Sequence, residues 1–94
     1  MNIELTLIGK PGCHLCEDAE SAVDRVLASF LAANPSVSVS ITQQNILDYA
    51  ELASRYSEEI PVLLINGKVH NYWRIDEERF TGALNDLVAE ATKE

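Results

Sequence analysis

The chain contains two cysteines, which lie three residues apart in the motif Cys13-His14-Leu15-Cys16. An apolar run over residues 3–8 and a turn-forming segment over residues 9–12 precede this C-x-x-C motif, and a stretch with helical periodicity follows it. The motif is therefore expected at a junction between a strand and a helix. A C-x-x-C pair in this position is typical of proteins whose two sulfurs cycle between a dithiol and a disulfide.

Length and composition predict a single globular domain over residues 1–94. The chain is 47% hydrophobic, which is enough for one core and too much for a disordered protein. A purely structural disulfide between the two cysteines is disfavoured, because it would close a very short loop and the stabilisation by a disulfide grows with loop length.

The charge of the chain argues against several classes of partner. It has 15 acidic and 7 basic residues, for a net charge of −8. Neither nucleic acid nor an anionic membrane surface is expected to bind, because both require clustered lysine and arginine. The N-terminal residues lack the positive region of a secretory signal, and no apolar stretch is long enough to span a membrane. We therefore expect a cytoplasmic protein, in which a lone C-x-x-C is more often catalytic or metal-binding than structural.

Hydrophobic periodicity in the first half of the chain predicts a strand, a helix and a second strand. The apolar run over residues 3–8 indicates a buried strand. Apolar residues at helical spacing then continue from about the C-x-x-C motif to Asn34-Pro35, where the proline stops the helix. Residues 37–41 alternate strictly between apolar and polar, which is typical of a strand with one covered face.

A short helix is predicted over residues 48–56. Asp48 and Glu51 form a variant of the capping box, and Leu47 and Leu52 are placed to pack over its first turn. Among the aromatic residues, four lie on apolar stripes and are expected in the core, namely Phe30, Tyr49, Tyr56 and Phe80.

The last part of the chain predicts a hairpin followed by a helix. Residues 60–65 form a strand that begins with a proline, and the hairpin signal Asn66-Gly67 turns residues 68–73 back antiparallel. Asp76 is expected to cap the final helix. The element order is thus β-α-β-α-β-β-α, an α/β fold with a central mixed four-stranded sheet flanked by three helices.

Three segments resemble the small glutaredoxins of the thioredoxin-fold superfamily. They are Lys-Pro-Gly-Cys-His-Leu-Cys-Glu-Asp-Ala over residues 10–19, Arg55-Tyr56, and Ile60-Pro61-Val62-Leu63. The resemblance covers nearly the whole chain and is strongest to a small bacterial glutaredoxin-like domain family. It implies a thioredoxin-like fold in which the Ile60–Pro61 peptide bond is cis and Pro61 packs against the C-x-x-C motif.

Each residue around the motif has an expected role. Cys13 is the nucleophile at a helix N-terminus, which stabilises a thiolate, and Cys16 is the resolving thiol. By resemblance, Lys10 lies beside the thiol and a glutathione carboxylate, and Ile60 offers its backbone N–H and C=O to an extended substrate. His14 either stabilises the Cys13 thiolate when protonated or faces solvent.

The chain departs from the residue patterns of both thioredoxins and glutaredoxins. Leu7 replaces a buried acid of thioredoxins and Gly12 replaces a tryptophan, so both favour the glutaredoxins. Glutaredoxins hold the γ-glutamyl end of glutathione with two glycines before an aspartate. Asp76 matches that aspartate, but Trp73 and Arg74 stand near the place of the glycines. Arg74 either pairs with a substrate carboxylate or is an ordinary surface residue.

Two further residues near this segment have expected environments. Trp73 is expected to be a half-buried packing residue rather than a platform for substrate. His70, in the last predicted strand, is expected to face solvent. Neither is assigned a role in chemistry.

The sequence favours a thiol–disulfide oxidoreductase that reduces protein disulfides or glutathione mixed disulfides through Cys13 and Cys16. No bound cofactor is expected, with glutathione a candidate reductant or co-substrate and a separate reductase recycling the pair. The alternative is a non-enzymatic thioredoxin-fold module: a metal or iron–sulfur carrier, a redox sensor or an interaction domain. Zinc is disfavoured because a structural zinc site needs four ligands. His14 lies inside the C-x-x-C loop and cannot readily join the two cysteines in one site.

Overall fold

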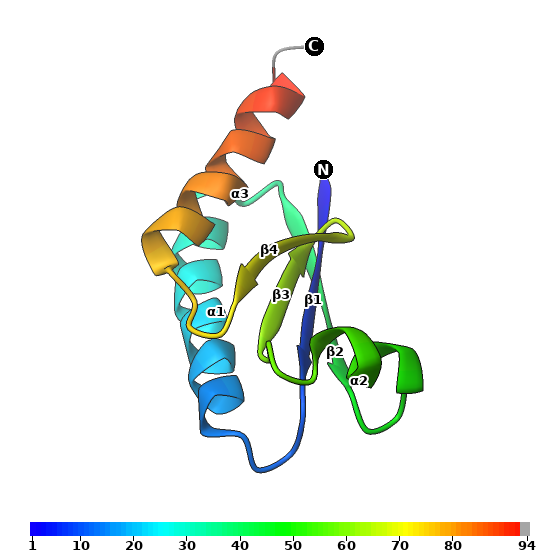
Figure 1. The fold of residues 1–94 in the computed structure, drawn as a ribbon. Helices are drawn as coiled ribbons and strands as arrows, with labels where there is room; N and C mark the ends of the chain where they lie inside the picture. The colour runs from blue at the N-terminus through cyan, green and yellow to red at the C-terminus, as the bar shows by residue number, and fades with distance from the viewer. Residues whose placement is uncertain (93–94) are drawn as a thin grey trace.

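The computed structural model describes residues 1–92 and has the element order β-α-β-α-β-β-α (Figure 1). This order confirms the prediction, although several boundaries differ. The strands are β1 (Asn2–Gly9), β2 (Ser38–Asn45), β3 (Val62–Ile65) and β4 (Lys68–Tyr72), and the helices are α1 (His14–Ala33), α2 (Ala50–Tyr56) and α3 (Glu77–Thr92). No helix within the described residues is long and apolar enough to cross a membrane.

The four strands form one mixed sheet in the order β2-β1-β3-β4. β1 runs parallel to β2, because the helical crossover α1 returns the chain in the same direction. β3 is antiparallel to both β1 and β4, and Ile8 of β1 lies opposite Val62 of β3. The C-terminal end of β1 therefore lies beside the N-terminal end of β3.

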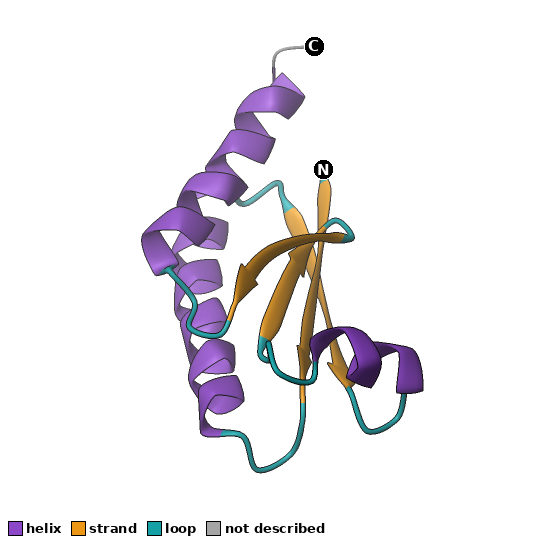
Figure 2. Cartoon of the chain, viewed as in Figure 1, coloured by secondary structure: helices purple, strands orange, loops and turns teal. Residues whose placement is uncertain are grey.

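The larger hydrophobic core fills the space between the sheet and the pair α1 and α3. Figure 2 shows these two helices together on one side of the sheet. Alternate β1 residues face them, as the period-two geometry of a strand requires. The buried members of this cluster are Ile3, Leu5, Leu7, Ala19, Val23, Val26, Leu27, Phe30, Leu63, Phe80 and Leu84.

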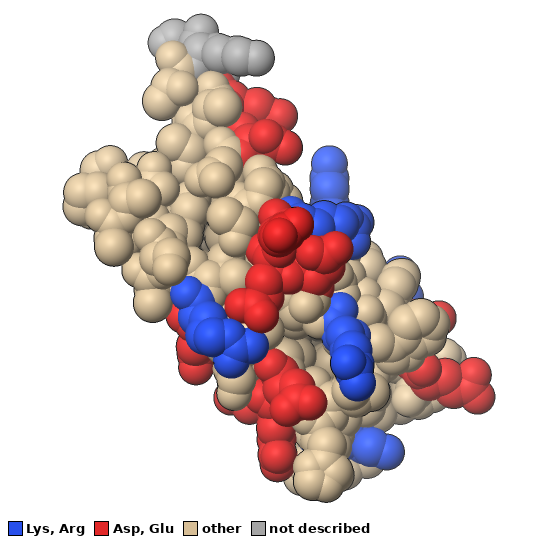
Figure 3. Space-filling view, turned by 90° about the vertical axis from the view of Figure 1, so that its left-hand side faces the viewer, with Lys and Arg blue, Asp and Glu red and all other residues tan. Residues whose placement is uncertain are grey.

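The two helices also contact each other through charged side chains. The Arg25 guanidinium of α1 donates two hydrogen bonds to the Glu77 carboxylate of α3, at 3.3 and 3.1 Å. Figure 3 shows this side of the molecule, where acidic and basic side chains lie next to one another. Such an exposed pair orients the two helices but adds little to stability.

A smaller core, which we call the α2 cluster, lies under α2. Its buried residues are Ile8, Ile46, Tyr56, Ile60 and Val62, and both cysteines pack against it. Figure 1 shows that α2 lies near the C-terminal ends of β1 and β2, so it covers only that end of the sheet. The C-x-x-C motif is thus part of the packing at this end.

The predicted hairpin between β3 and β4 is confirmed. Asn66 and Gly67 both have positive φ, of 50° and 81°, as a tight hairpin turn requires. Asn66 also ties the turn to β1, because its N–H donates to the Glu4 carbonyl at 2.7 Å and its Oδ1 accepts from the Glu4 N–H at 2.9 Å.

The predicted start of α2 is wrong. The helix begins at Ala50, and Asp48 does not cap it. Instead, Asn45 Oδ1 accepts a hydrogen bond from the Leu47 N–H at 2.8 Å, and this local turn competes with helix formation. Leu47 is 71% exposed and does not pack over the helix, and Tyr49 is 52% exposed rather than part of the core.

The second strand is longer than residues 37–41. β2 continues to Asn45 because it pairs with β1 along its whole length, which carries polar residues into the ladder. The strict alternation placed the apolar residues of this strand on its covered face, but Ile41 is exposed. β2 is an edge strand, and polar side chains suit that position.

His70 does not face solvent as expected. The pairing of β3 and β4 shifts register so that His70 is an extra residue between Val69 and Asn71, and such a bulge redirects a side chain. The His70 ring lies 6.0 Å from the Phe80 ring, and its buried Nε2 has no hydrogen-bond partner among the described residues. Burial, helped by the nearby positive charge of Arg79, lowers the pKa of His70 below 6.5.

We expect this histidine to make the free energy of unfolding depend on pH. The unfolded chain binds the proton at a higher pH than the folded chain, so stability is full above pH 6.5 and is lost as pH falls through the lowered pKa of His70. Denaturant titrations from about pH 7.5 downward should show this loss, and His70→Phe should reduce it. His14→Phe, on an exposed residue, is the control, and an unchanged slope in His70→Phe would contradict the assignment.

Candidate functional site

The C-x-x-C motif lies where the loop after β1 enters α1, as predicted (Figure 1). Cys13 is the N-cap residue of α1, and its Sγ accepts a hydrogen bond from the Cys16 N–H at 3.1 Å. The two cysteines form a disulfide, and their Cα atoms are 5.2 Å apart. In the reduced protein, the unpaired N–H groups and the dipole of α1 would stabilise a Cys13 thiolate.

Gly9 makes room for the disulfide at the end of β1. A Cβ atom at this position would lie 2.9 Å from Cys16 Sγ and 3.3 Å from Cys16 Cβ. Real Cβ atoms do not tolerate such an approach, so the close contact between β1 and the motif requires a glycine. The sequence had indicated Gly9 only as a turn former.

Ile60 and Pro61 lie beside the motif, at the start of β3. The Ile60–Pro61 peptide bond is cis, in agreement with the expectation from the resemblance, and Pro61 is fully buried. Ile60 belongs to the α2 cluster, against which both cysteines pack. Its N–H and C=O make no backbone hydrogen bond within residues 1–92. Ile60 itself is 8% exposed.

Lys10 and His14 flank the motif on its exposed side. Lys10 is exposed in the loop before Cys13. The His14 side chain is 98% exposed, and its Nδ1 lies 3.8 Å from the Glu17 carboxylate. The structure therefore places the His14 ring in solvent beside the motif.

Arg74 and Asp76 lie in the turn between β4 and α3, which a buried asparagine holds in place. Asn71 donates through Nδ2 to the carbonyls of Tyr72 and Arg74, at 2.8 and 2.6 Å. Asp76 Oδ1 accepts from the Arg79 N–H at 3.1 Å, which confirms Asp76 as a cap of α3. Arg74 is exposed and forms no ion pair with the part of the chain that is described.

The turn is attached to the Pro61 segment through Trp73. The Trp73 N–H donates to the Pro61 carbonyl at 2.7 Å, and its indole Nε1 donates to the Glu58 carbonyl at 3.1 Å. Trp73 is 52% exposed, which agrees with the expectation of a half-buried residue. Sequence reasoning missed Asn71, because nothing local distinguishes it from any other polar strand residue.

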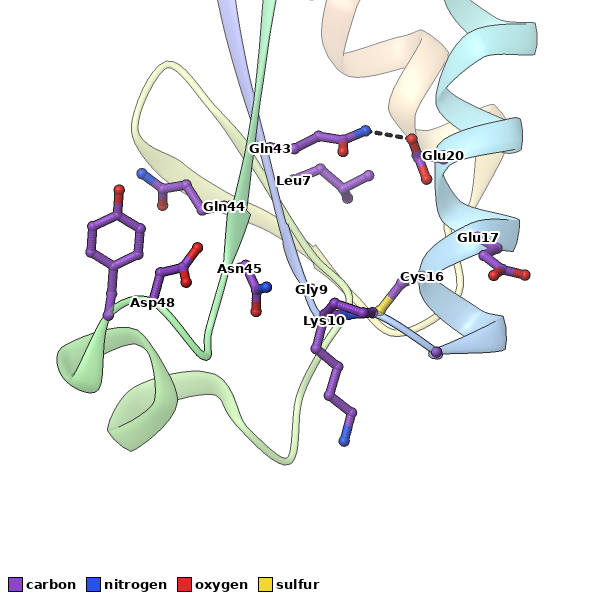
Figure 4. Close-up of a pocket in the computed structure, with 13 residues that line it drawn as sticks. Leu7, Gly9, Lys10, Cys16, Glu17, Glu20, Gln43, Gln44, Asn45 and Asp48 are labelled. Atoms are coloured by element: carbon purple, nitrogen blue, oxygen red, sulfur yellow. Dashed lines mark hydrogen bonds between the residues drawn. The ribbon is translucent and has the colours of Figure 1, made fainter.

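A cavity of about 450 Å³ opens on the other side of the motif, next to Cys16 (Figure 4). It lies between the start of α1 and the C-terminal ends of β1 and β2. Gln43 of β2 donates a side-chain hydrogen bond to Glu20 of α1 across it. Cys16 lines this cavity, whereas Cys13 and Pro61 do not. The cavity therefore borders Cys16 but not Cys13.

The described residues contain no group of three or more His, Cys, Asp or Glu side chains that could hold a metal ion. The chemistry that the arrangement supports is that of the two sulfurs, which form a disulfide. Cys13 lies at a helix N-terminus, Cys16 is one turn further along, and Ile60 presents free backbone groups beside them.

Comparisons with known proteins place this arrangement in a family. Residues 4–85 match the model of the family described as Glutaredoxin-like domain (DUF836). No curated protein matches the chain.

Solved structures share its fold. The crystal structure of protein XcR50 from X. campestris is 28% identical, with a TM-score of 0.67, and the match covers 87% of this chain and 96% of that one. The solution structure of Ne2328 from Nitrosomonas europaea is 20% identical, with a TM-score of 0.70 and coverage of 86% and 89%. The germline-specific thioredoxin Deadhead from Drosophila melanogaster is 18% identical, with a TM-score of 0.57 and coverage of 92% and 81%. The fold is therefore thioredoxin-like.

The contact between Gly9 and Cys16 leads to a prediction on stability. Gly9→Ala should lower the free energy of unfolding by about 1–3 kcal/mol, because the added methyl group overpacks the motif. Gly82→Ala is the matched control, since a Cβ there meets nothing within 4 Å and alanine stabilises a helix by about 0.5–1 kcal/mol relative to glycine. Denaturant unfolding measures both, and a Gly9→Ala variant as stable as the wild type would contradict the constraint.

Proposed function

Because the chain belongs to the glutaredoxin-like domain family, we propose that it is a thiol–disulfide oxidoreductase that reduces protein disulfides or glutathione mixed disulfides. The observation that carries the proposal is the Cys13–Cys16 disulfide at the N-terminus of α1. A disulfide in this position supports redox work, because the helix end favours the thiolate form of the first cysteine.

In the reducing half-reaction, the Cys13 thiolate attacks one sulfur of the substrate disulfide. A bond forms between Cys13 and that sulfur, and the other substrate sulfur leaves as a thiolate that takes a proton from solvent. The Cys16 thiolate then attacks Cys13 Sγ and expels the second substrate sulfur. Two electrons have passed to the substrate, and the protein is left as the Cys13–Cys16 disulfide.

The oxidised pair must then be reduced again. Either a thiol such as glutathione or a dithiol reductase supplies the two electrons. A cytoplasmic location fits this cycle, because a reducing compartment keeps the pair in the dithiol form that donates electrons.

Neighbouring residues support the cycle in this proposal. The Cys16 N–H that bonds to Cys13 Sγ would also bond to a thiolate, and such charge-assisted bonds are the stronger ones. The Lys10 ammonium adds positive charge in the loop before Cys13, and Ile60 binds the backbone of the substrate. Asp76 fixes the start of α3, and Arg74 beside it offers a guanidinium to a substrate carboxylate.

Substitution of each cysteine tests the proposal. Cys13→Ser should reduce disulfide-reduction activity to background, because no other sulfur attacks the substrate first. Cys16→Ser should still attack and then accumulate a mixed disulfide, which mass spectrometry identifies as a glutathione or a protein adduct.

The assay uses insulin or glutathione disulfide with an excess of dithiol, and circular dichroism confirms that each variant is folded. Activity in Cys13→Ser equal to that of the wild type would rule out the oxidoreductase. A brown preparation whose colour depends on Cys13 would instead favour the iron–sulfur carrier.

A further inference from the structure

Trp73 has an unusual backbone conformation in the turn that is bonded to Pro61. Its φ of 61° lies in the left-handed region, which a bulky side chain rarely occupies. Its N–H is bound to the Pro61 carbonyl, and Asn71 binds the carbonyls of the residues on either side of it, Tyr72 and Arg74. Strained residues that their surroundings hold so firmly are concentrated at binding and catalytic sites.

The Trp73 side chain is fixed in orientation but open to solvent. Its indole N–H is bound to the Glu58 carbonyl at 3.1 Å, and its ring centroid lies 6.2 Å from that of Tyr72. Both rings are nevertheless exposed. A tryptophan that served only to pack the core would bury most of its ring. We call the exposed parts of these two side chains the aromatic surface.

The aromatic surface borders the segment with free backbone groups. Trp73 occupies the carbonyls of Glu58 and Pro61, while Ile60 between them keeps its own N–H and C=O without a partner in the described chain. Ile60 also packs in the same cluster as the two cysteines. An extended chain bound to Ile60 would therefore bring its disulfide to Cys13 and a neighbouring side chain to the aromatic surface.

The charges of this segment disfavour a small anionic ligand. Glu58 and Glu59 precede Ile60 directly, and Arg74 lies in the turn that is bonded to Pro61. Glutathione disulfide carries a net negative charge, so like charges oppose its approach. An apolar side chain of a polypeptide, in contrast, gains by covering the exposed indole.

We propose that Trp73 determines specificity, so that the preferred substrate is a disulfide within an extended polypeptide segment rather than a free tripeptide disulfide. This inference rests on the proposed oxidoreductase function. The chemistry is unchanged: Cys13 forms a bond to one sulfur of the polypeptide disulfide and the other sulfur leaves as a thiolate. The Cys16 thiolate then attacks Cys13 Sγ and expels the second substrate sulfur, and a dithiol reductant reduces the resulting Cys13–Cys16 disulfide.

The test compares kcat/KM for insulin and for glutathione disulfide, with dithiothreitol as the reductant. Trp73→Ala should lower kcat/KM for insulin about tenfold or more, because one aromatic contact of this kind carries that much binding. It should leave the value for glutathione disulfide unchanged or raised. Trp73→Gly removes the ring and also relieves the left-handed strain, and it should change the two kcat/KM values as Trp73→Ala does. Agreement between the two variants would show that loss of the ring, not damage to the backbone, causes the effect.

Ile41→Ala is the control, since Ile41 is also exposed, at 44%, but lies on the edge strand β2, outside both the aromatic surface and the cavity next to Cys16. Its ratio of the two kcat/KM values should equal that of the wild type. Trp73→Phe, which keeps an aromatic ring, should retain most of the preference for insulin.

Two results would overturn the inference while leaving the oxidoreductase intact. The first is a wild type that prefers glutathione disulfide. The second is a ratio unchanged in Trp73→Ala and Trp73→Gly, whether activity is kept or falls equally on both substrates. If the wild type reduces neither substrate faster than Cys13→Ser does, the proposed function itself is wrong. Thermal unfolding of each variant confirms that it is folded at the assay temperature.

Discussion

The antiparallel pairing of β1 with β3 is the constraint on which the candidate site depends. It places Ile8 opposite Val62, so the loop that leaves β1 and the segment that enters β3 meet at one edge of the sheet. The cysteines lie where the loop after β1 enters α1, and Pro61 lies directly before β3. The cysteines pack against the α2 cluster, which contains Ile60 and Val62 on either side of Pro61. A shift of the register by one residue would turn the side chains of β3 to the opposite face.

A single buried amide organises the other side of the site. Asn71 is the buried polar residue of β4, and hydrogen bonds satisfy its side chain, as burial of an amide requires. These bonds shape the turn in which Trp73 and Arg74 lie. The hydrogen bond from the Trp73 N–H to the Pro61 carbonyl then joins this turn to the start of β3. The position of the turn therefore depends on both the Asn71 hydrogen bonds and the β1–β3 pairing.

Sequence reasoning succeeded where the determining interactions are local. Asn66-Gly67 specifies its hairpin through backbone preference alone, and Asp76 caps its own helix. It failed where a competing contact decided the outcome. The Asn45 turn displaced the expected start of α2, and a bulge turned His70 inward. The hydrogen bond from the Trp73 indole to the Glu58 carbonyl joins residues 15 positions apart, and no local pattern indicates it. The cis bond before Pro61 came from family resemblance, because X-Pro pairs alone do not specify it.

The β1–β3 pairing also bears on when this chain becomes reactive during its synthesis. The two strands are far apart in the sequence, and contacts between distant segments form late in folding because they must first overcome the entropy of closing a long loop. Until they form, Cys13 lacks the Pro61 segment beside it. A nascent chain would thus carry the two cysteines without this neighbour, and completion of the sheet would assemble the environment of the disulfide.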